Sequence, residues 1–477
     1  MTKKVCAPGL MLLLSAICLT TIASAQTSWW RTYGGSGDDV GNSVQQTTDG
    51  GYIIAGYTSF LGAGGQDVYV IKTDASGDTL WTKTYGGTRN DEGNSVQQTT
   101  DGGYVIVGWT ISLGAGLADV YLVKTDSLGD TLWTRTYGGT SYDEGFSVQQ
   151  TTDGGYIITG CTYSFGAGRY DIYLVKTNAQ GDTLWTRTYG GTGIDWGYSV
   201  QQTTGGGYII TGNTTSFGAG GNDVYLIKTN AQGGILWTRT FGGTDDDEGY
   251  SVQQTTDGGY IITGCTSSFG AGRLDIYLVK TNAQGDTLWT RTYGGTGNDA
   301  GNSVQQTSDG GYIVCGKLGI HDFDACLVKT DADGDTLWTR IYGGTSADCG
   351  NSVRQTTDGG YIIAGYTYSF GVGTPDSANA YLIKTDALGN VGIEESQTTR
   401  SVRPTRFPVQ PNPFSSCARV PGHETALFAL SDVTGRQVAI CKGDRVGEGL
   451  RPGIYFLSPV SLRTGKAVTT TIIKAAY

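Results

Sequence analysis

Two histidines, His321 and His423, are the only imidazoles in the 477-residue chain. A Ser-His-acid triad or a zinc centre needs several placed ligands, or a nucleophile and an acid beside the histidine. Neither spacing occurs around these residues. We therefore expect His321 to be an exposed loop residue, and the sequence predicts neither a metal site nor a cofactor.

Carboxylates are plentiful and suit glycoside hydrolysis, which needs two of them at a fixed separation. Most acidic residues recur in register along the chain, whereas a catalytic pair should break the repeat. The acidic residues that break the register are Glu92, Glu144, Asp245, Asp246, Glu248 and Asp322. The sequence alone does not tell which of them lie together.

Two acidic stretches resemble calcium loops. "DADGD" (331–335) lacks the glycine and glutamate positions of a calcium-binding hand, and its sister copies read "NAQGD". "TDDDEG" (244–249) is more typical of a solvated acidic loop. Neither stretch predicts bound calcium.

The elements that would position these residues come from one repeated unit. A period of 52 residues, shortened to 49 in the last step, is typical of propellers and solenoids. In the third copy, four runs rich in β-branched and aromatic residues predict strands at 147–151, 156–162, 171–177 and 183–189. The unit is marked by Tyr-Gly-Gly or Phe-Gly-Gly at Tyr33, Tyr85, Tyr137, Tyr189, Phe241, Tyr293 and Tyr342.

The first and last copies are incomplete in complementary ways. "WWRTY" (29–33) is a fourth strand with nothing before it, and the last copy stops after "DALGN" (386–390) without a fourth strand. An open solenoid would need capping repeats at both ends instead. We therefore predict an all-β protein, a seven-bladed β-propeller over residues 26–390 that is closed by an N-terminal outer strand.

Two residue series recur once per repeat and are expected to be structural. Each tryptophan lies on the fourth strand, where it would pack one blade on the next, and each aspartate precedes the first strand, where it would accept backbone N–H groups. The tryptophans are Trp29, Trp81, Trp133, Trp185, Trp237, Trp289 and Trp338. The aspartates are Asp39, Asp91, Asp143, Asp195, Asp247, Asp299 and Asp348.

The unit "KTDASGDTLWTKTYG" (72–86) resembles the repeat of quinoprotein-like propellers. The resemblance implies that a glycine turn followed by tryptophan docks successive blades. It concerns one strand pair per blade and implies no quinone.

Strand alternation places two short, uniform turns on one face of the propeller and two longer, variable loops on the other. Loops on a rigid scaffold commonly carry binding sites, and this variable face is rich in aromatic residues beside carboxylates. We take the candidate ligand-binding residues to be Tyr57, Trp109, Tyr142, Tyr170, Trp196 and Tyr366. An exposed rim with packing aromatics is the alternative.

Residues 1–25 have a charged start, an apolar stretch and Ala23-Ser24-Ala25, which predicts a secretory signal peptide. No second apolar span follows, so an exported protein without a transmembrane segment is expected. Residues 26–399 hold 19 Lys+Arg and 39 Asp+Glu, and a body this acidic argues against a nucleic-acid partner. Residues 391–402 resemble a linker.

The last segment, 403–477, carries "QPNPFSS" (410–416), "ALSDVTGRQVA" (429–439), "LRPGIYFL" (450–457) and "TTTIIKAAY" (469–477). In combination these resemble the C-terminal sorting domain of the type IX secretion system. The resemblance implies a small β-sandwich, the type IX machinery as partner, and a secreted or outer-membrane surface location. The residues that it marks as the sorting signal are Gly435, Arg436, Gly453, Tyr455 and Lys474.

After the signal peptide, Cys315 and Cys326 flank one hairpin and are candidates for a disulfide, as are Cys417 and Cys441. Three functions remain open at this point. The first is a non-enzymatic module that binds a glycan or a protein, the second is an endoglucanase-like glycoside hydrolase, and the third is a structural surface repeat. Near-identical copies favour the binding or structural roles over an evolved active site.

Overall fold

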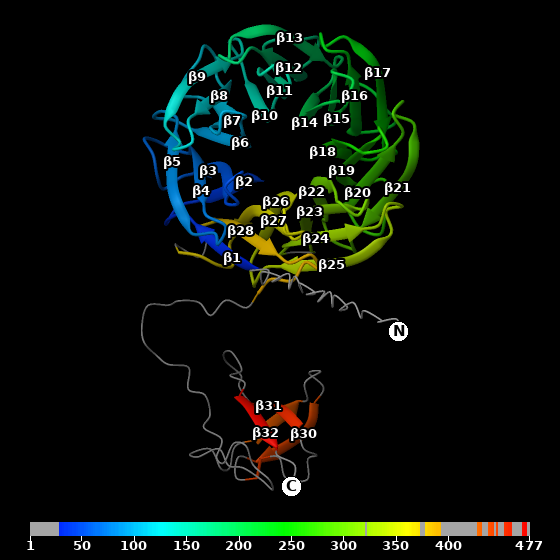
Figure 1. Ribbon diagram of the computed structural model, residues 1–477. Coiled ribbons are helices and arrows are strands. Elements are labelled where there is room, and N and C mark those ends of the chain that lie inside the picture. The colour runs from blue at the N-terminus through cyan, green and yellow to red at the C-terminus, as the bar shows by residue number, and fades with distance from the viewer. Residues whose placement is uncertain are drawn as a thin grey trace, which may run out of the picture. The chain divides into compact units, whose positions relative to one another are not determined.

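Each repeat forms a four-stranded antiparallel sheet, and seven such sheets surround a common axis (Figure 1). The computed structural model describes residues 28–319, 322–372, 377–392, 427–431, 437–442, 445–446, 453–459 and 470–474. The chain divides into two units, residues 1–394 and 395–477. All regular elements in the described residues are strands, and no helix there could cross a membrane.

The first and second strands of each blade are joined by the uniform "TTDGG"-type turn. The first strands, which lie nearest the axis, are β2 (Asp39–Gln46), β6 (Asp91–Gln98), β10 (Asp143–Gln150), β14 (Asp195–Gln202), β18 (Asp247–Gln254), β22 (Ala300–Gln306) and β26 (Asp348–Gln355). The second strands are β3 (Tyr52–Thr58), β7 (Tyr104–Thr110), β11 (Tyr156–Thr162), β15 (Tyr208–Thr214), β19 (Tyr260–Thr266), β23 (Tyr312–Leu318) and β27 (Tyr361–Thr367).

The third strands are the most completely buried, and the fourth strands form the outer edge. The third strands are β4 (Asp67–Thr73), β8 (Asp119–Thr125), β12 (Asp171–Thr177), β16 (Asp223–Thr229), β20 (Asp275–Thr281), β24 (Asp324–Thr330) and β28 (Asn379–Thr385). The fourth strands are β5 (Thr79–Tyr85), β9 (Thr131–Tyr137), β13 (Thr183–Tyr189), β17 (Ile235–Phe241), β21 (Thr287–Tyr293), β25 (Thr336–Tyr342) and, for the last blade, β1 (Trp29–Tyr33).

The ring closes through β1, as the complementary ends of the repeat predicted. This strand pairs antiparallel with β28, with Trp29 opposite Lys384 and Tyr33 opposite Ala380. Figure 1 shows the blue N-terminal strand beside the orange strand of the last blade. The seven-bladed propeller closed by an N-terminal outer strand is therefore confirmed.

The first strand of each blade begins earlier than the sequence predicted. In the third blade it starts at Asp143 rather than Ser147, because a β-bulge at Phe146 lets the preceding residues keep pairing with β11. The same bulge lies between the recurring glycine and serine of all seven innermost strands. The extra residue at each bulge turns out to be part of the candidate site.

Each outer-strand tryptophan packs on the following blade, as predicted. Trp133 lies 5.9 Å from the ring of Tyr156, and a Cβ on Gly181, which has φ of +79°, would lie 2.7 Å from the Trp133 ring. The hydroxyl of Tyr137 donates to the carbonyl of Gly181 at 2.7 Å. The aromatic side chains of the preceding blade therefore pack against the glycine turn.

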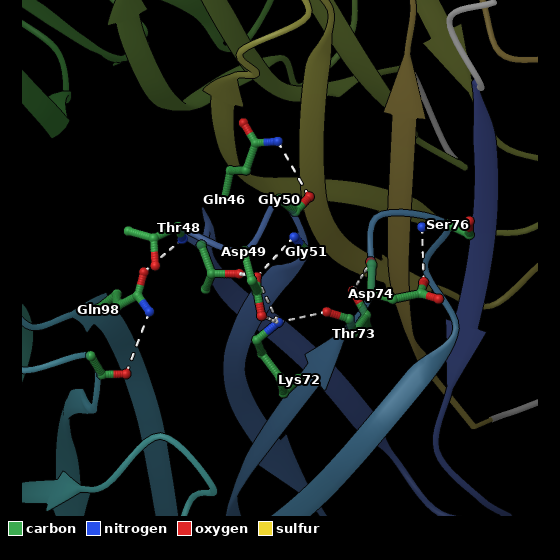
Figure 2. A network of polar contacts seen from close by, with 12 residues as sticks. Gln46, Thr48, Asp49, Gly50, Gly51, Lys72, Thr73, Asp74, Ser76 and Gln98 are labelled. Atoms are coloured by element: carbon green, nitrogen blue, oxygen red, sulfur yellow. Dashed lines mark hydrogen bonds and ion pairs between the residues drawn. The ribbon is translucent and has the colours of Figure 1, made fainter. Parts of the chain in front are cut away.

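A buried lysine network holds the uniform face together (Figure 2). Lys72, whose side chain is 3% exposed, lies 2.9 Å from the carboxylate of Asp49 and donates to the carbonyl of Thr73. The amide of Gln98, from the next blade, accepts the N–H of Thr48. The lysine–aspartate pair recurs in six blades but not in the fourth, where Gly205 replaces the aspartate.

The predicted disulfide between Cys315 and Cys326 does not form, because both residues are free thiols. Across β23 and β24, Cys315 is opposite Leu327 and Cys326 is opposite Gly316. The two side chains therefore point to opposite sides of the blade and pack in different interblade cores. Cys417, of the other candidate pair, lies outside the described residues, as does His321.

The second unit contains an antiparallel four-stranded sheet in the order β30-β29-β31-β32. Its strands are β29 (Leu427–Ser431), β30 (Gln437–Lys442), β31 (Gly453–Pro459) and β32 (Thr470–Lys474). Gly453 begins β31, which contains Tyr455, and Lys474 ends β32. Gly435 and Arg436 lie outside the described residues, as do residues 1–25 and 393–402, and the β-sandwich remains a prediction.

Candidate functional site

The variable loops are held in place by the aspartate that starts each innermost strand. In the third blade, Asp143 accepts the N–H of Gly139 at 2.8 Å and the hydroxyls of Ser164 and Thr162. The corresponding backbone N–H bond is present in all seven blades. The aspartate series therefore has the structural role that the sequence predicted, and it fixes the frame on which variable residues are displayed.

Directly after this aspartate, one side chain of the innermost strand lies opposite one side chain of the second strand. The seven pairs are of six kinds, since only the Glu–Cys pair occurs twice, although the backbone around them is the same. The seven pairs are Val40–Tyr57, Glu92–Trp109, Glu144–Cys161, Trp196–Asn213, Glu248–Cys265, Ala300–Lys317 and Cys349–Tyr366. The variation that a binding site requires is thus concentrated around the axis.

The bulge residues form a second ring beside these pairs, and this ring is divided into two arcs. Four consecutive blades supply amides, which we call the asparagine arc: Asn302, Asn351, Asn42 and Asn94. Each of these amides donates to a backbone carbonyl of the following blade at 2.9 to 3.2 Å. The other three blades supply aromatic side chains, Phe146, Tyr198 and Tyr250.

The aromatic side chains are in mutual contact and extend outward from the axis. Tyr198 lies 5.3 Å from Phe146 and 5.4 Å from Tyr250, measured between ring centroids. Trp196 stacks on Phe146 at 6.0 Å and meets Tyr170 at 5.6 Å. We call these five residues the aromatic arc.

The structure separates the predicted ligand-binding residues into two groups. Trp196 and Tyr170 belong to the aromatic arc, and the exposed Tyr142 lies in the loop preceding β10, in the same blade as Tyr170. The other three predicted residues, Tyr57, Trp109 and Tyr366, occupy equivalent positions near the ends of second strands in three consecutive blades. The two groups lie in adjacent arcs of the ring, because the blade of Trp109 directly precedes that of Tyr142.

Two of the register-breaking carboxylates, Glu92 and Glu144, lie between these groups on adjacent blades. The pKa of Glu92 is raised to about 7. Burial is the largest cause and the nearby charge of Glu144 adds to it, whereas a hydrogen bond from Trp109 lowers the pKa. Burial also raises the pKa of Glu144. Glu92 is therefore partly protonated near neutral pH and can both donate and accept hydrogen bonds.

The remaining register-breaking acids do not join this pair. The carboxylate of Glu248 accepts the hydroxyl of Tyr250 at 2.7 Å, which ties it to the aromatic arc. Asp245, Asp246 and Asp322 are exposed on loops, and Asp246 accepts the backbone N–H of Asn222 at 2.8 Å.

Sequence reasoning missed Phe146 and the whole asparagine arc. The signal was present in one column of the repeat, the residue between the recurring glycine and serine, which reads Asn, Asn, Phe, Tyr, Tyr, Asn, Asn along the chain. Because the ring closes, the two ends of this series are neighbours. Four amides therefore become contiguous only when the propeller is closed.

No protein-family model matches the chain. The regulatory protein FlaEY of Caulobacter vibrioides is 24% identical over 258 residues, 47% of this chain and 26% of FlaEY, so the chain spans about a quarter of that relative. Among solved structures, PorZ, a surface component of the type-IX secretion system of Porphyromonas gingivalis, is similar with a TM-score of 0.43 and 11% identity, covering 93% of this chain and 60% of PorZ. The periplasmic gluconolactonase PpgL of Pseudomonas aeruginosa is similar with a TM-score of 0.44 and 11% identity, and the match covers 74% of this chain and 99% of PpgL. The propeller fold itself follows from the strand order and register.

Proposed function

We propose that this chain is an exported, non-catalytic propeller that binds carbohydrate around the axis on its variable face. One observation carries the proposal: three consecutive blades present the aromatic arc, and the other four present the asparagine arc. A sugar ring has the same division, with an apolar face of C–H groups and a rim of hydroxyls. Apolar surfaces with a few placed polar groups are typical of small-molecule sites.

The carboxylates support the same ligand class. Glu92 lies opposite Trp109 and Glu144 lies on the adjacent blade, which contributes to the aromatic arc; both have a raised pKa because they are buried. A carboxyl group that is partly protonated can hydrogen-bond sugar hydroxyls in either direction. The acidic body, with 39 Asp+Glu against 19 Lys+Arg over residues 26–399, favours neutral over acidic glycans.

Export is part of the proposal. It is supported by the signal-peptide pattern of residues 1–25 and by the sorting-domain resemblance of residues 403–477. The type IX machinery is the corresponding partner, and the cell surface or the medium is the corresponding location. Detection of the chain in the culture medium or on the outer surface, lost when residues 403–477 are deleted, tests this part alone.

The binding proposal is tested by retention of the full chain on a panel of insoluble neutral polysaccharides, with reducing ends counted in the supernatant. We expect retention without sugar release, and at least tenfold weaker retention for Tyr170→Ala and for Tyr198→Ala. Leu132→Ala is the matched control, because this side chain is 58% exposed on the outer strand β9. Equal retention of all four proteins, or no retention of any, contradicts the proposal and favours a protein partner or a structural role.

A glycoside hydrolase is the second candidate, and the pair Glu92 and Glu144 specifically favours it. Two neighbouring carboxyl groups, one of them with a pKa near 7, are the groups that such chemistry uses as acid and base. Sugar release that is abolished by Glu92→Gln while retention persists would replace the binding module with this enzyme.

A further inference from the structure

The axial channel holds a cavity of about 220 Å³, lined by the later residues of the innermost strands. Its wall contains serine, valine and glutamine side chains in a nearly regular ring. Among the described residues that line it there is no carboxylate and a single cation, Arg354. The lining therefore differs in charge from the acidic propeller around it.

The glutamines of this wall have a defined orientation, because their oxygens are already used. Gln45 accepts the backbone N–H of Gln98 in the next blade at 2.7 Å through Oε1. Five further bonds of this kind, at 2.6 to 2.7 Å, continue around the ring. The six glutamines are Gln45, Gln97, Gln149, Gln201, Gln253 and Gln305.

Each of these amides is left with its NH₂ group, which can only donate. In the described part of the chain, no protein acceptor contacts the Nε2 atom of any of the six. Serine oxygens of the wall are engaged in the same way, for example that of Ser147 by the N–H of Val200 at 3.3 Å. The cavity wall thus offers donors, while its main acceptors are occupied.

Arg354 replaces the seventh glutamine and adds a cation to this ring of donors. One of its nitrogens donates to its neighbour Val353 at 2.8 Å, which leaves most of the guanidinium donors for the cavity. Burial lowers the pKa of Arg354, so the charged form lacks the solvation it would have in water. A half-buried cation beside a ring of amide donors is an environment for an anion.

We propose that the axial channel binds a small carboxylate at Arg354. A guanidinium presents paired N–H groups that match the two oxygens of a carboxylate. The single positive charge balances one negative charge, and no second cation in the described lining would balance a dianion. The volume is several times that of formate or acetate, so either anion fits with water beside it. The neutral NH₂ groups of the glutamine ring complete its hydrogen bonds.

Acetate is the probe, and Arg354→Gln is the decisive variant, because glutamine is the residue that six blades already carry at this position. The midpoint of thermal unfolding of the full chain is measured with increasing sodium acetate, at an ionic strength held constant with a bulky sulfonate salt. We expect acetate to raise the midpoint of the natural chain by several degrees and to bind Arg354→Gln at least tenfold more weakly by calorimetric titration. A crystal grown in acetate should show a planar anion against the guanidinium.

Equal acetate responses of the two proteins overturn the proposal, as does a channel that holds only water in crystals grown with acetate. The result is independent of the carbohydrate proposal, since the cavity-lining residues do not include the aromatic or asparagine arc. Loss of acetate binding in Arg354→Gln with unchanged polysaccharide retention supports a separate anion site. We expect Tyr170→Ala, which loses polysaccharide retention, to bind acetate as the natural chain does.

Discussion

One position of each repeat determines which chemistry surrounds the axis on the variable face. The residue at the bulge is asparagine in four blades and aromatic in three, while the glycine before it and the serine after it do not change. The bulge frees this side chain from regular pairing. Substitution there changes the surface, and any hydrogen bond of the side chain itself, while the strand pairing on either side of the bulge is the same in all seven blades.

Glu92 gives a prediction about pH. Its folded pKa of about 7 lies above the unfolded value of about 4.3, so the folded state binds the extra proton between these values. The stabilisation that comes from protonating Glu92 in the folded state is therefore present at low pH and is lost as pH rises toward 7. We expect Glu92→Gln to raise the free energy of unfolding at pH 8 by on the order of 1 kcal/mol, after discounting for partial exposure, and less at pH 5.

Urea unfolding at both pH values measures this difference. Asp245→Asn, in an exposed loop, is the control and should change neither value. A pH dependence of stability that is the same in Glu92→Gln as in the natural chain would show that Glu92 does not titrate in this window.

The fourth blade gives a prediction from its missing aspartate. Among the described residues, Lys228 has only the hydroxyl of Thr203 and the carbonyl of Thr229 as acceptors, and burial lowers its pKa. A Cβ at Gly205 would meet no atom within 4 Å, so the substitution fits. We expect Gly205→Asp to stabilise the protein by about 1 kcal/mol in urea unfolding at pH 7. Gly205→Ala separates the backbone effect, and equal stability of the two variants would refute the ion pair.

The pH range of this gain follows from the other blades. At Asp49, burial alone would raise the pKa, but hydrogen bonds from Thr47 and Lys72 hold it at about 2. A depressed carboxyl pKa stabilises the folded state above the unfolded value and stops doing so as pH falls through the folded value. The advantage of Gly205→Asp should therefore disappear between about pH 4 and pH 2.

At the scale of strands, the sequence predicted most boundaries because tight turns fix them. The predicted runs 156–162, 171–177 and 183–189 coincide with β11, β12 and β13, since Gly154 and Gly181 both have a φ that favours glycine. The early start of β10 was missed, because a bulge interrupts the alternation of inward and outward side chains by which a strand is recognised in a sequence. The proximity of Glu92 and Glu144 was missed for another reason: it depends on how neighbouring blades face each other.

Two glycine turns with the same backbone conformation allow the cost of backbone strain to be distinguished from the cost of a lost packing contact. Gly154 and Gly181 have φ of +83° and +79°, but only a Cβ on Gly181 would meet the Trp133 ring, at 2.7 Å. We expect Gly154→Ala to cost about 1 kcal/mol of unfolding free energy and Gly181→Ala about 2–4 kcal/mol. Denaturant unfolding of both variants is the measurement. Equal costs would mean that Trp133 does not depend on this turn.

At the scale of the whole molecule, the five-residue strand β1 contacts both the first blade and the last. Trp29 is 2% exposed and lies 5.8 Å from Tyr52 of the first blade. The neighbouring Trp30 lies 5.1 Å from Phe370 of the last blade. The strand that contains both tryptophans also completes the last sheet through β28. Closure therefore depends on contacts to both blades rather than on a covalent link.

A rearranged chain tests whether β1 acts only as the missing fourth strand. The turn that should precede such a strand already exists, because Asp386 and Asn390 bond as their counterparts do in other blades. A chain that starts at Ser28 should unfold at the natural temperature, whereas one that starts at Gly34 exposes the edge of β28 and should lose at least ~5 kcal/mol. Adding Thr-Leu-Trp-Thr-Arg-Thr-Tyr after Asn390 to the shorter chain supplies the strand from the other end. We expect this addition to restore most of the lost stability in calorimetry, because each of the other six blades carries its own fourth strand there. If it restores none, closure requires contacts particular to Trp29 and Trp30, and the propeller is not a simple ring of interchangeable blades.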